Sequence, residues 1–332
     1  MNDRVHLPVV SNSELECFRR CPRLHLFKYI LMRRPIRVAA PLDLGSLNHA
    51  GQEAWLRAIQ SPNDLSPLDY AMAAIEKKAR QIKADPLLQV QAEELMIGYH
   101  CRWIDDKWEI LAVEQEFECD ALDPVLKTNV GRLGGKMDAV VKIGVDQFIV
   151  EHKSTSFDFS AGSHYWERTR LSSQLGLYFY GARSLGYRPA GTIYDVVGKP
   201  KDCEPKRATP AEKRKYTKSG ALYANQSEED EKPDDYRERL RAAIQEEPER
   251  FYARRVVVRL ASEIDAAVND LCATVALMGI TTKIGAHPRH VDSCFDFNRR
   301  CEFYGVCTGE ENIRDDHKFR TARSRHEELG VI

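Results

Sequence analysis

Three residues that could act together in hydrolysis lie in two neighbouring segments with the pattern of β-strands. Asp138 ends the sequence Gly135-Lys-Met-Asp138, and Glu151 and Lys153 flank His152 in the next segment. Alternate residues of a strand point to the same side, so Glu151 and Lys153 share one face. Pairing of the two strands in a hairpin would bring Asp138 close to Glu151. Two carboxylates and an ammonium group would then converge.

These groups suit metal-assisted hydrolysis of a phosphodiester. Paired carboxylate oxygens are hard ligands for Mg²⁺ or Mn²⁺, which lower the pKa of a bound water and stabilise charge on a phosphoryl group. The lysine would orient the nucleophile or neutralise charge in the transition state. The spacing alone also fits an edge hairpin with a surface aspartate and a solvated Glu–Lys face, because such triples are common.

A second group of residues with metal-binding chemistry is formed by cysteines. Cys294, Cys301 and Cys307 lie in one short segment, and Cys21 lies before Pro22 near the other end of the chain. Four thiolates are the ligand set of an Fe–S cluster or of structural Zn²⁺. Cys17, one helical turn before Cys21, could compete for the ligand role. The remaining cysteines are scattered and are expected to be free thiols: Cys101, Cys119, Cys203 and Cys272.

The carboxylate and lysine motifs belong to a longer series. Gly45-Ser-Leu-Asn-His49 comes first, Gly135-x-x-Asp138 and Glu151-x-Lys153 follow, and Gln174-Leu-Gly-Leu-Tyr178 comes last. In these motifs, their order and their separation, the sequence resembles the PD-(D/E)XK nuclease superfamily. The similarity covers residues 45 to 180 and is to the branch with RecB-type nuclease domains and CRISPR-associated and phage exonucleases.

The resemblance implies a set of metal ligands. His49, Asp138 and Glu151 would bind Mg²⁺ or Mn²⁺, and the backbone carbonyl of His152 would be a further ligand. Taken alone, a histidine such as His49 is more often a hydrogen-bonded core or surface residue. Only the surrounding motif favours the ligand role.

The resemblance also implies the catalytic residues. Lys153 would be the catalytic lysine, and Gln174 and Tyr178 would position it or the DNA. Gln174 and Tyr178 lie at i and i+4 on one helix face, which equally fits an ordinary packed tyrosine beside a glutamine. Glu114 and Glu116, in the strand before Asp138, are expected to be structural or to face DNA rather than to bind metal.

The same nuclease branch contains members with an iron–sulfur staple, which has one cysteine before the nuclease core and three after it. By this resemblance Cys21, Cys294, Cys301 and Cys307 would hold an Fe–S cluster, expected to be 4Fe-4S. Six residues separate Cys294 from Cys301, where some members have two. Zinc therefore stays open as the alternative metal.

Sequence patterns predict the elements that must position these groups. Capping boxes at Ser11 with Glu14 and at Ser13 with Glu16 predict a first helix over 11–29. A hairpin of strands with a turn at 144–146, followed by a helix and a further strand, indicates an α/β fold. We expect a restriction-endonuclease-like mixed sheet flanked by helices. The predicted helices are 45–60, 67–83, 87–108, 164–185, 233–246 and 260–279, and the predicted strands are 110–119, 131–143, 147–153, 192–197 and 254–259.

The chain divides into four expected regions. Residues 1–108 form a helical region with Cys21 and His49, and residues 109–200 form the nuclease core. Residues 201–235 form an exposed charged insertion, and residues 236–332 carry the C-terminal helices and the cysteine cluster. The stretch 199–218 has eight basic and three acidic residues, and 228–235 is strongly acidic. The insertion could contact DNA phosphates or be a solvated loop.

Composition limits the function further. The 332 residues include 49 Lys and Arg against 50 Asp and Glu, so DNA binding would depend on local patches rather than on net charge. No run approaches the roughly 18 apolar residues that span a bilayer, and the start of the chain lacks a signal-peptide core. We expect a cytoplasmic protein with no membrane partner. No Gly-x-x-x-x-Gly-Lys-[Ser/Thr] loop occurs, so no nucleotide cofactor is expected.

Together these features predict a metal-dependent DNA exonuclease that processes DNA ends in recombination, repair or phage replication. It would act alone or with a separate helicase or recombination partner. The alternatives are an inactive protein that binds DNA and uses the Fe–S centre structurally, and a structure-specific nicking enzyme with the same site. The intact Asp138, Glu151 and Lys153 favour the active enzyme.

Overall fold

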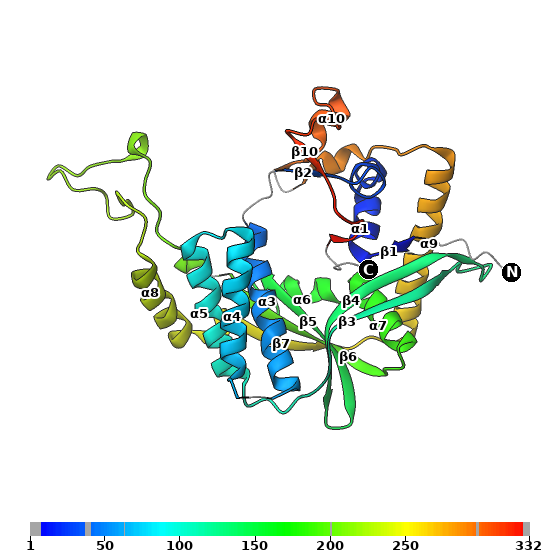
Figure 1. The fold of residues 1–332 in the computed structure, drawn as a ribbon, viewed down its shortest axis with the longest axis horizontal. Coiled ribbons are helices and arrows are strands. Elements are labelled where there is room, and N and C mark those ends of the chain that lie inside the picture. Colours follow the sequence, from blue (N-terminus) through cyan, green and yellow to red (C-terminus); the bar gives the residue numbers. More distant parts are fainter. Residues whose placement is uncertain (1–7, 37–40, 63, 200, 297–298, 328–332) are drawn as a thin grey trace.

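A six-stranded mixed sheet with helices on both faces forms the centre of the molecule (Figure 1). The strand order is β1-β4-β5-β6-β7, with β3 also paired to β4. This architecture confirms the predicted α/β fold class. The computed structural model describes residues 8–36, 41–62, 64–199, 201–296 and 299–327. The strands are β1 (Val9–Val10), β3 (Glu109–Leu122), β4 (Asn129–Ile143), β5 (Asp146–Thr155), β6 (Pro189–Gly198) and β7 (Tyr252–Val257).

Strand β4 has three partners that divide its length. β3 pairs antiparallel along nearly the whole of one edge. On the other edge, β5 pairs antiparallel with residues 139–143, and β1 pairs parallel with Arg132 and Leu133. Residues 134–138 have no strand partner on this edge among the described residues. The sheet therefore forks at Asp138, where β5 leaves β4.

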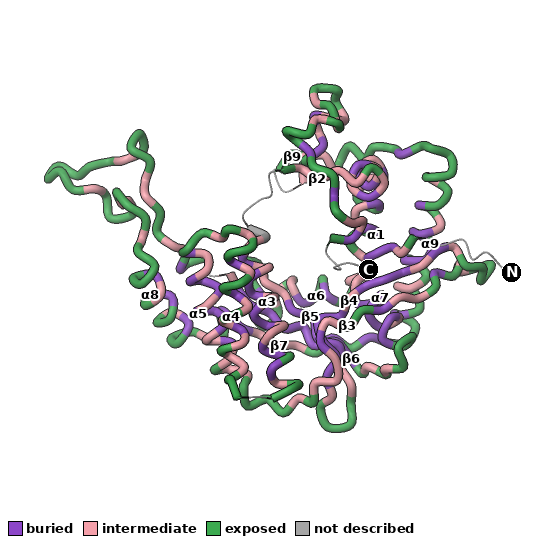
Figure 2. The backbone as a smooth tube through the Cα atoms, in the orientation of Figure 1, coloured by how far each residue is buried: buried purple, intermediate pink, exposed green. Residues whose placement is uncertain are grey.

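Helices cover both faces of the sheet, and the residues between the layers are buried (Figure 2). Helices α3, α4, α5 and α8 pack on one face, and α1, α7 and α9 pack on the other. Each face buries its own apolar core, as expected for a sheet between two helical layers. The helices are α1 (Asn12–Arg20), α3 (Pro41–Gln60), α4 (Pro67–Ile82), α5 (Pro86–Trp103), α7 (Ser173–Ser184), α8 (Pro233–Glu246) and α9 (Ala261–Ile284).

The hairpin that carries the acidic residues forms as predicted, but the helix after it is broken. The predicted helix over 164–185 is two helices, α6 (His164–Thr169) and α7. The buried Arg259 side chain donates hydrogen bonds to the carbonyls of Arg170 and Ser172, at 2.5 and 2.9 Å. These bonds satisfy backbone acceptors that a continuous helix would have used internally.

The first predicted helix, over 11–29, is also interrupted. α1 ends at Arg20, and α2 (Pro22–His25) and the π-helical turn η1 (Leu26–Ile30) follow. Cys21 between them is extended, with φ −164° and ψ 114°. The residue before a proline avoids helical geometry because of a steric clash with the proline ring. The remaining predicted elements form with shifted ends; for example, the helix predicted over 87–108 ends at Trp103.

Segments from both ends of the chain form a second layer, which we call the cysteine lobe. Its two-stranded sheet pairs β2 (Arg33–Pro35) antiparallel with β10 (Phe319–Thr321). Its small core contains Leu24, Phe27 and Phe303. The lobe comprises α2, η1, β2, η5 (Val291–Cys294), β8 (Phe295–Asp296), β9 (Arg299–Arg300), α10 (Tyr304–Thr308) and β10.

Helix α9 is the one described helix that is long and apolar enough to cross a membrane, by length and composition only. Leu271, Val275 and Met278 on one side of it are buried in the core against the sheet. A helix that packs on a protein core passes the same test of composition. The first seven residues, where no signal-peptide core is expected, lie outside the described part of the chain.

Glu14 does not form the predicted capping box. Ser11 caps α1 and accepts from the Glu14 backbone N–H at 3.2 Å, but the Glu14 side chain is fully buried elsewhere. It contacts His25 Nε2 at 2.7 Å, and Arg325 Nε donates to it at 3.0 Å. Burial raises the pKa of Glu14, but the hydrogen bonds from His25 and Arg325 outweigh it and lower the pKa. This carboxylate therefore ties the start of the chain to residue 325.

We expect Glu14→Gln to lower the free energy of unfolding by roughly 3 kcal/mol near neutral pH, because it leaves a buried charge network incomplete. The pKa of Glu14 is depressed in the folded protein, so its contribution exists above the ordinary value of 4.5 and is lost as the pH falls through the folded value. Urea unfolding at several pH values checks this. Glu16→Gln, at an exposed position of the same helix, is the control. A difference between wild type and Glu14→Gln that stays constant from neutral pH to well below 4.5 would contradict the expectation.

Candidate functional site

The fork in the sheet coincides with a change in side-chain direction. Met137 and Val140, three residues apart, pack in the same core, while Ala139 packs in the core of the other face. Strict alternation would place Met137 and Ala139 on one side. Glu114, which stands opposite Asp138 on β3, has a left-handed backbone with φ +54°. A non-glycine residue in this conformation is strained, and such residues cluster at functional sites.

His49, Asp138 and Glu114 meet at this point. His49 Nε2 lies 3.0 Å from Asp138 Oδ1 and 3.7 Å from Glu114 Oε1. His49 comes from the middle of α3, which crosses the face of the sheet beside β3 and β5. Glu114 is also paired with Lys136, which lies two residues before Asp138 on β4. The structure thus brings together the predicted His49 and Asp138, and adds Glu114.

Glu151 and Lys153 lie on the other prong of the fork. The Lys153 ammonium pairs with Glu151 Oε1 and donates to Gln174 Oε1 at 3.0 Å. Gln174 Nε2 in turn donates to the hydroxyl of Tyr178 at 2.8 Å. Because α7 begins at Ser173, Gln174 lies in its first turn and reaches β5, while the ring of Tyr178 packs against Phe117 of β3. The structure therefore joins the four predicted residues in one chain of contacts.

His152 supports the site through its backbone and its ring. Its backbone N–H donates to Asp138 Oδ2 at 2.7 Å, in place of the strand pairing, which ends at Val150. The Nδ1 atom of its ring lies 3.1 Å from Gln52 Nε2 and 3.2 Å from Asp195 Oδ2. Arg254 Nε donates to Asp195 Oδ1 at 3.0 Å. The other ring nitrogen, Nε2, is buried without a hydrogen-bond partner among the described residues, and the ring centre lies 6.2 Å from that of His49.

Burial and neighbouring charges set the protonation of the site. Burial lowers the pKa of His49, but the hydrogen bond and charge of Asp138 outweigh it and raise that pKa to about 9. Burial raises the pKa of Asp138, but His49 outweighs it and the pKa is lowered. Burial keeps the pKa of Glu151 raised despite the charge of Lys153. For Lys153, burial lowers the pKa, and the charge of Glu151 reverses this and raises it, so the ammonium stays protonated.

The carboxylate oxygens that remain fit a divalent cation. Glu151 Oε2 and Glu114 Oε1 are buried and have no hydrogen-bond partner in the part of the chain that the structure describes. Buried carboxylate oxygens are normally paired, and Mg²⁺ or Mn²⁺ prefers oxygen ligands of this kind. The predicted His49 and Asp138 adjoin the same point. The donor set therefore fits the cation that the sequence predicts.

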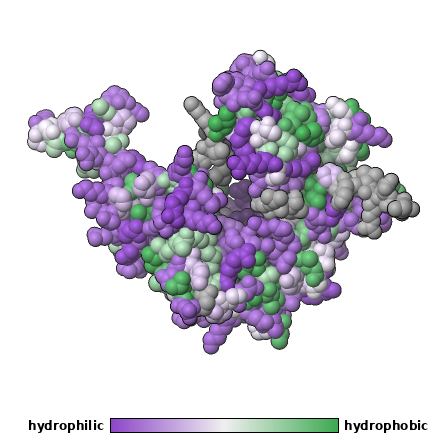
Figure 3. Space-filling model, in the orientation of Figure 1, coloured by the Kyte–Doolittle hydropathy of each residue, from purple (hydrophilic) through white to green (hydrophobic). Residues whose placement is uncertain are grey.

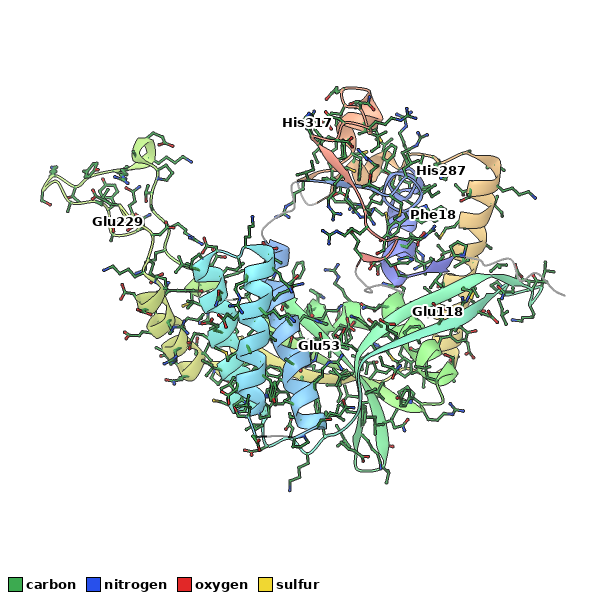
Figure 4. All side chains as sticks on the ribbon, in the orientation of Figure 1. Phe18, Glu53, Glu118, Glu229, His287 and His317 are labelled. Carbon is green, nitrogen blue, oxygen red and sulfur yellow. The ribbon has the colours of Figure 1, made fainter. Side chains whose placement is uncertain are left out.

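The structure places beside His49 two carboxylates that sequence reasoning did not assign to the metal site, Glu114 and Glu53. Donor atoms of His49, Glu53 and Glu114 all lie within 4.8 Å of one another. Glu53 is one helical turn after His49, on the same side of α3, and Figure 4 labels it near the centre of the view. The spacing His49-x-x-x-Glu53 was the available signal. No local signal marked Glu114, because its importance comes from pairing with β4. Glu116 is exposed.

The four predicted cysteines line one small cavity in the cysteine lobe. Cys21, Cys294, Cys301 and Cys307 all border it, together with Phe27 and Phe303. All four cysteines are free thiols. The backbone N–H of Cys301 donates to the carbonyl of Cys294 at 2.8 Å. Cys17 packs beside the lobe core but does not line the cavity, and burial raises its pKa to about 12. The position of Cys21 at the cavity favours it over Cys17 as a ligand.

The spacing of these sulfurs bears on the metal. Among the described residues, no three of the cysteine sulfurs lie within 4.8 Å of one another. Zinc–sulfur bonds of about 2.3 Å would bring tetrahedral ligands within about 4 Å of each other. The sulfurs would therefore have to move closer together to bind a single zinc ion.

The fork lies below the cysteine lobe. In Figure 3 the face of the molecule is hollowed between the helices α3 to α5 and this lobe. His49 on α3 and Lys153 on β5 belong to the elements that meet there in Figure 1.

Comparison with known proteins gives one extensive match. A family model described as PD-(D/E)XK nuclease superfamily matches residues 9–308. Among solved structures, a protein named "Putative exonuclease" from Eubacterium rectale aligns with 12% identity over 98% of this chain and 94% of that chain, with a TM-score of 0.45. SSO0001 aligns with 12% identity over 81% and 86%, with a TM-score of 0.31. No curated protein matches.

We expect Glu114→Gln to weaken Mn²⁺ binding about 10–100-fold, because it removes a buried oxygen charge beside His49 and Asp138. Isothermal titration of Mn²⁺ into the protein measures this directly. Glu116→Gln removes the same charge two residues along the strand, at an exposed position, and should leave the affinity unchanged. Equal affinities for the wild type and both variants would remove Glu114 from the cation site.

Proposed function

Because the chain belongs to the PD-(D/E)XK nuclease superfamily, we propose that it is a metal-dependent DNA exonuclease that hydrolyses phosphodiester bonds at DNA ends. The pathway we propose for it is DNA end processing in recombination, repair or phage replication. A separate helicase or recombination protein would supply strand separation.

One observation carries this proposal. Asp138 and Glu151 lie on the two prongs of the forked sheet, and Lys153 pairs with Glu151, whose other oxygen is buried and unpartnered. This combination supports binding of a divalent cation next to a positively charged lysine. An ordinary structural ion pair would not leave a buried carboxylate oxygen without a partner.

The residues of the chain divide the work in the proposed reaction. His49, Asp138 and Glu151 would hold Mg²⁺ or Mn²⁺, with the carbonyl of His152 and with Glu114 as further oxygen donors. The bound cation would act as a Lewis acid on the phosphoryl group and activate a water. Lys153, kept protonated by Glu151, would stabilise negative charge that develops on the phosphate.

The remaining polar residues hold these groups in place. Gln174 fixes the Lys153 ammonium, and Tyr178 fixes Gln174. Asp195 and Gln52 hold the ring of His152, whose backbone N–H holds Asp138. Positioning of this kind matters because displacement of a reacting group by about 1 Å can cost about 10²-fold in rate.

We further propose that Cys21, Cys294, Cys301 and Cys307 hold an Fe–S cluster of the 4Fe-4S type. The cavity that all four cysteines line supports it. Nine free cysteines also suit a reducing compartment, so we place the protein in the cytoplasm. The cluster would link the two ends of the chain in the cysteine lobe and serve a structural role.

We expect Lys153→Ala to reduce cleavage of DNA by about 10²–10³-fold while DNA binding stays nearly unchanged, because the ammonium acts mainly on the transition state. The assay compares kcat/KM with Mg²⁺ or Mn²⁺ on end-labelled linear DNA, with a chelator as the metal-free control. Lys142→Ala, near the far end of β4, is the matched control. Cleavage by Lys153→Ala within a few-fold of wild type would refute the site.

The same assay tests the type of cleavage. An exonuclease degrades linear DNA from its ends and leaves covalently closed circular DNA intact. Cleavage of circular DNA at a comparable rate would refute the exonuclease assignment and favour an endonuclease or nicking enzyme. Absence of cleavage on every DNA, with binding retained, would favour an inactive DNA-binding protein.

Cys21→Ser, or the same change at any of the other three ligands, should destabilise the protein, because a link between distant segments constrains the unfolded chain by up to roughly 5 kcal/mol. Thermal melting and proteolysis measure the loss, and the exposed Cys101→Ser is the control. Protein purified without oxygen should be brown and contain iron and acid-labile sulfide. Stoichiometric zinc without iron would refute the cluster.

A further inference from the structure

Residues 201–232 form a long projection from the body of the protein, which we call the arm. In Figure 1 it rises on the same side of the molecule as the cysteine lobe, and most of it is exposed in Figure 2. Its sequence is basic at first and acidic later, so its charges could cancel. The structure shows which of these charged residues are paired and which are exposed.

The acidic part of the arm is paired at its root. Asp230 Oδ2 accepts from Arg207 at 2.9 Å, and Arg207 also reaches Asp85 of α5 at 3.0 Å. Glu231 Oε2 accepts from Arg239 of α8 at 2.7 Å. These pairs attach the root of the arm to α5 and α8. They pair two of the seven acidic residues of the arm, Asp230 and Glu231, close to the body of the protein.

The tip of the arm keeps its positive charge. Lys213, Lys215 and Lys218 are exposed, and among the described residues their ammonium groups have no carboxylate within ion-pair distance. Tyr216 and Tyr223 lie beside them with 52% and 46% of their surface exposed. The tip is an ordered turn rather than a loose loop. Its hydrogen bonds include Thr217 N–H to the Ala221 carbonyl at 2.7 Å and Tyr223 N–H to the Lys215 carbonyl at 3.1 Å.

A cavity of about 1020 Å³ lies between the fork and the root of the arm. It begins at Thr155, two residues after Lys153 on the same strand, and Lys199 N–H donates to the Thr155 carbonyl at 2.6 Å. Lys199 and Lys201 at the start of the arm line it. The cavity therefore continues from the strand that carries the proposed catalytic lysine to the arm.

The walls of this cavity combine positive charge with aromatic rings. Arg102 and Arg255 line it, each with its guanidinium over a tryptophan ring, at 5.0 Å and 4.5 Å from the ring centre. Arg102 Nε is buried and has no hydrogen-bond partner among the described residues. Phe157, in the loop after β5, lines the cavity with 58% of its surface exposed. Cations and exposed rings are the two components of sites for single-stranded nucleic acid.

We propose that the cavity and the arm form one binding path for a single strand of DNA that extends beyond the fork. The lysines contact phosphates, and Phe157, Tyr216 and Tyr223 stack on bases. Rings stack on bases only where the bases are unpaired, so the path selects a single strand over a duplex. This inference rests on the proposed nuclease function for the identity of the fork. It adds a substrate-binding surface and a preferred strand state.

The test removes the charge of the tip and measures binding as a function of salt. The variant Lys213→Gln/Lys215→Gln/Lys218→Gln is compared with Lys77→Gln/Lys107→Gln/Lys283→Gln, which removes the same charge from exposed or half-exposed positions on other parts of the surface. Fluorescence anisotropy with a chelator present follows binding of a single-stranded oligonucleotide of about 40 nucleotides without cleavage. Loss of three phosphate contacts should make the slope of log K against log salt less steep by about 2.

The length of the oligonucleotide distinguishes binding along the arm from binding at the fork. Cleavage of an oligonucleotide of about 6 nucleotides, which is too short to reach the tip, should be unchanged in the arm variant. Tyr216→Ala and Tyr223→Ala should each weaken binding of the long strand about fivefold or more. If the protein cleaves no DNA at all, the proposed nuclease function fails while the binding slopes still test the arm.

Three results would overturn the inference. Identical salt slopes for wild type and the arm variant would remove the arm from the DNA path. An equal change of slope in the control variant would mean that the effect comes from net charge and not from the arm. An equal loss of affinity for a blunt duplex would refute the preference for a single strand.

Discussion

The end of pairing between β4 and β5 is the constraint on which the site depends. If β5 followed β4 past Ala139, the edge of Asp138 would be filled by backbone hydrogen bonds, and no space would remain between Asp138 and Glu151. Instead, the backbone N–H of His152 bonds to the Asp138 side chain. Glu114, strained and left-handed on β3, turns its carboxylate to the same place. A regular sheet could not bring these groups together, so the proposed site depends on the irregularity.

Ion pairs stabilise the buried carboxylates at the fork and still leave oxygens that could bind a cation. Each buried carboxylate at the fork has a cationic neighbour: His49 for Asp138, Lys136 for Glu114 and Lys153 for Glu151. Breaking a buried pair costs about 3–5 kcal/mol, which keeps these partners together. Glu114 and Glu151 each retain a buried oxygen with no hydrogen-bond partner among the described residues. If His49 and Asp138 bind the cation as proposed, metal coordination replaces their ion pair, because histidine binds metals as the neutral imidazole.

Local sequence patterns predicted the parts of the fold that local physics decides. Alternation and the glycine turn were sufficient for the β4–β5 hairpin, and the Glu151-x-Lys153 spacing placed both side chains on one face. The break at Cys21 was also local, since Pro22 disfavours helix before it, and the long-helix prediction missed it. The role of Glu14 could not be predicted, because its partner Arg325 is 311 residues away. Glu114 was undervalued for the same reason: its position depends on its partner strand.

The cysteine lobe joins the two ends of the chain but has little hydrophobic core of its own. It therefore needs further links between these ends. Its buried apolar residues are few, and a core of that size supplies little stability. Polar contacts add to it: Arg23 Nε donates to the His287 carbonyl at 2.9 Å, and Glu14 binds Arg325. A metal centre on the four converging cysteines would fix the lobe above the fork. The position of the lobe relative to the sheet then follows from the same links that hold the chain ends together.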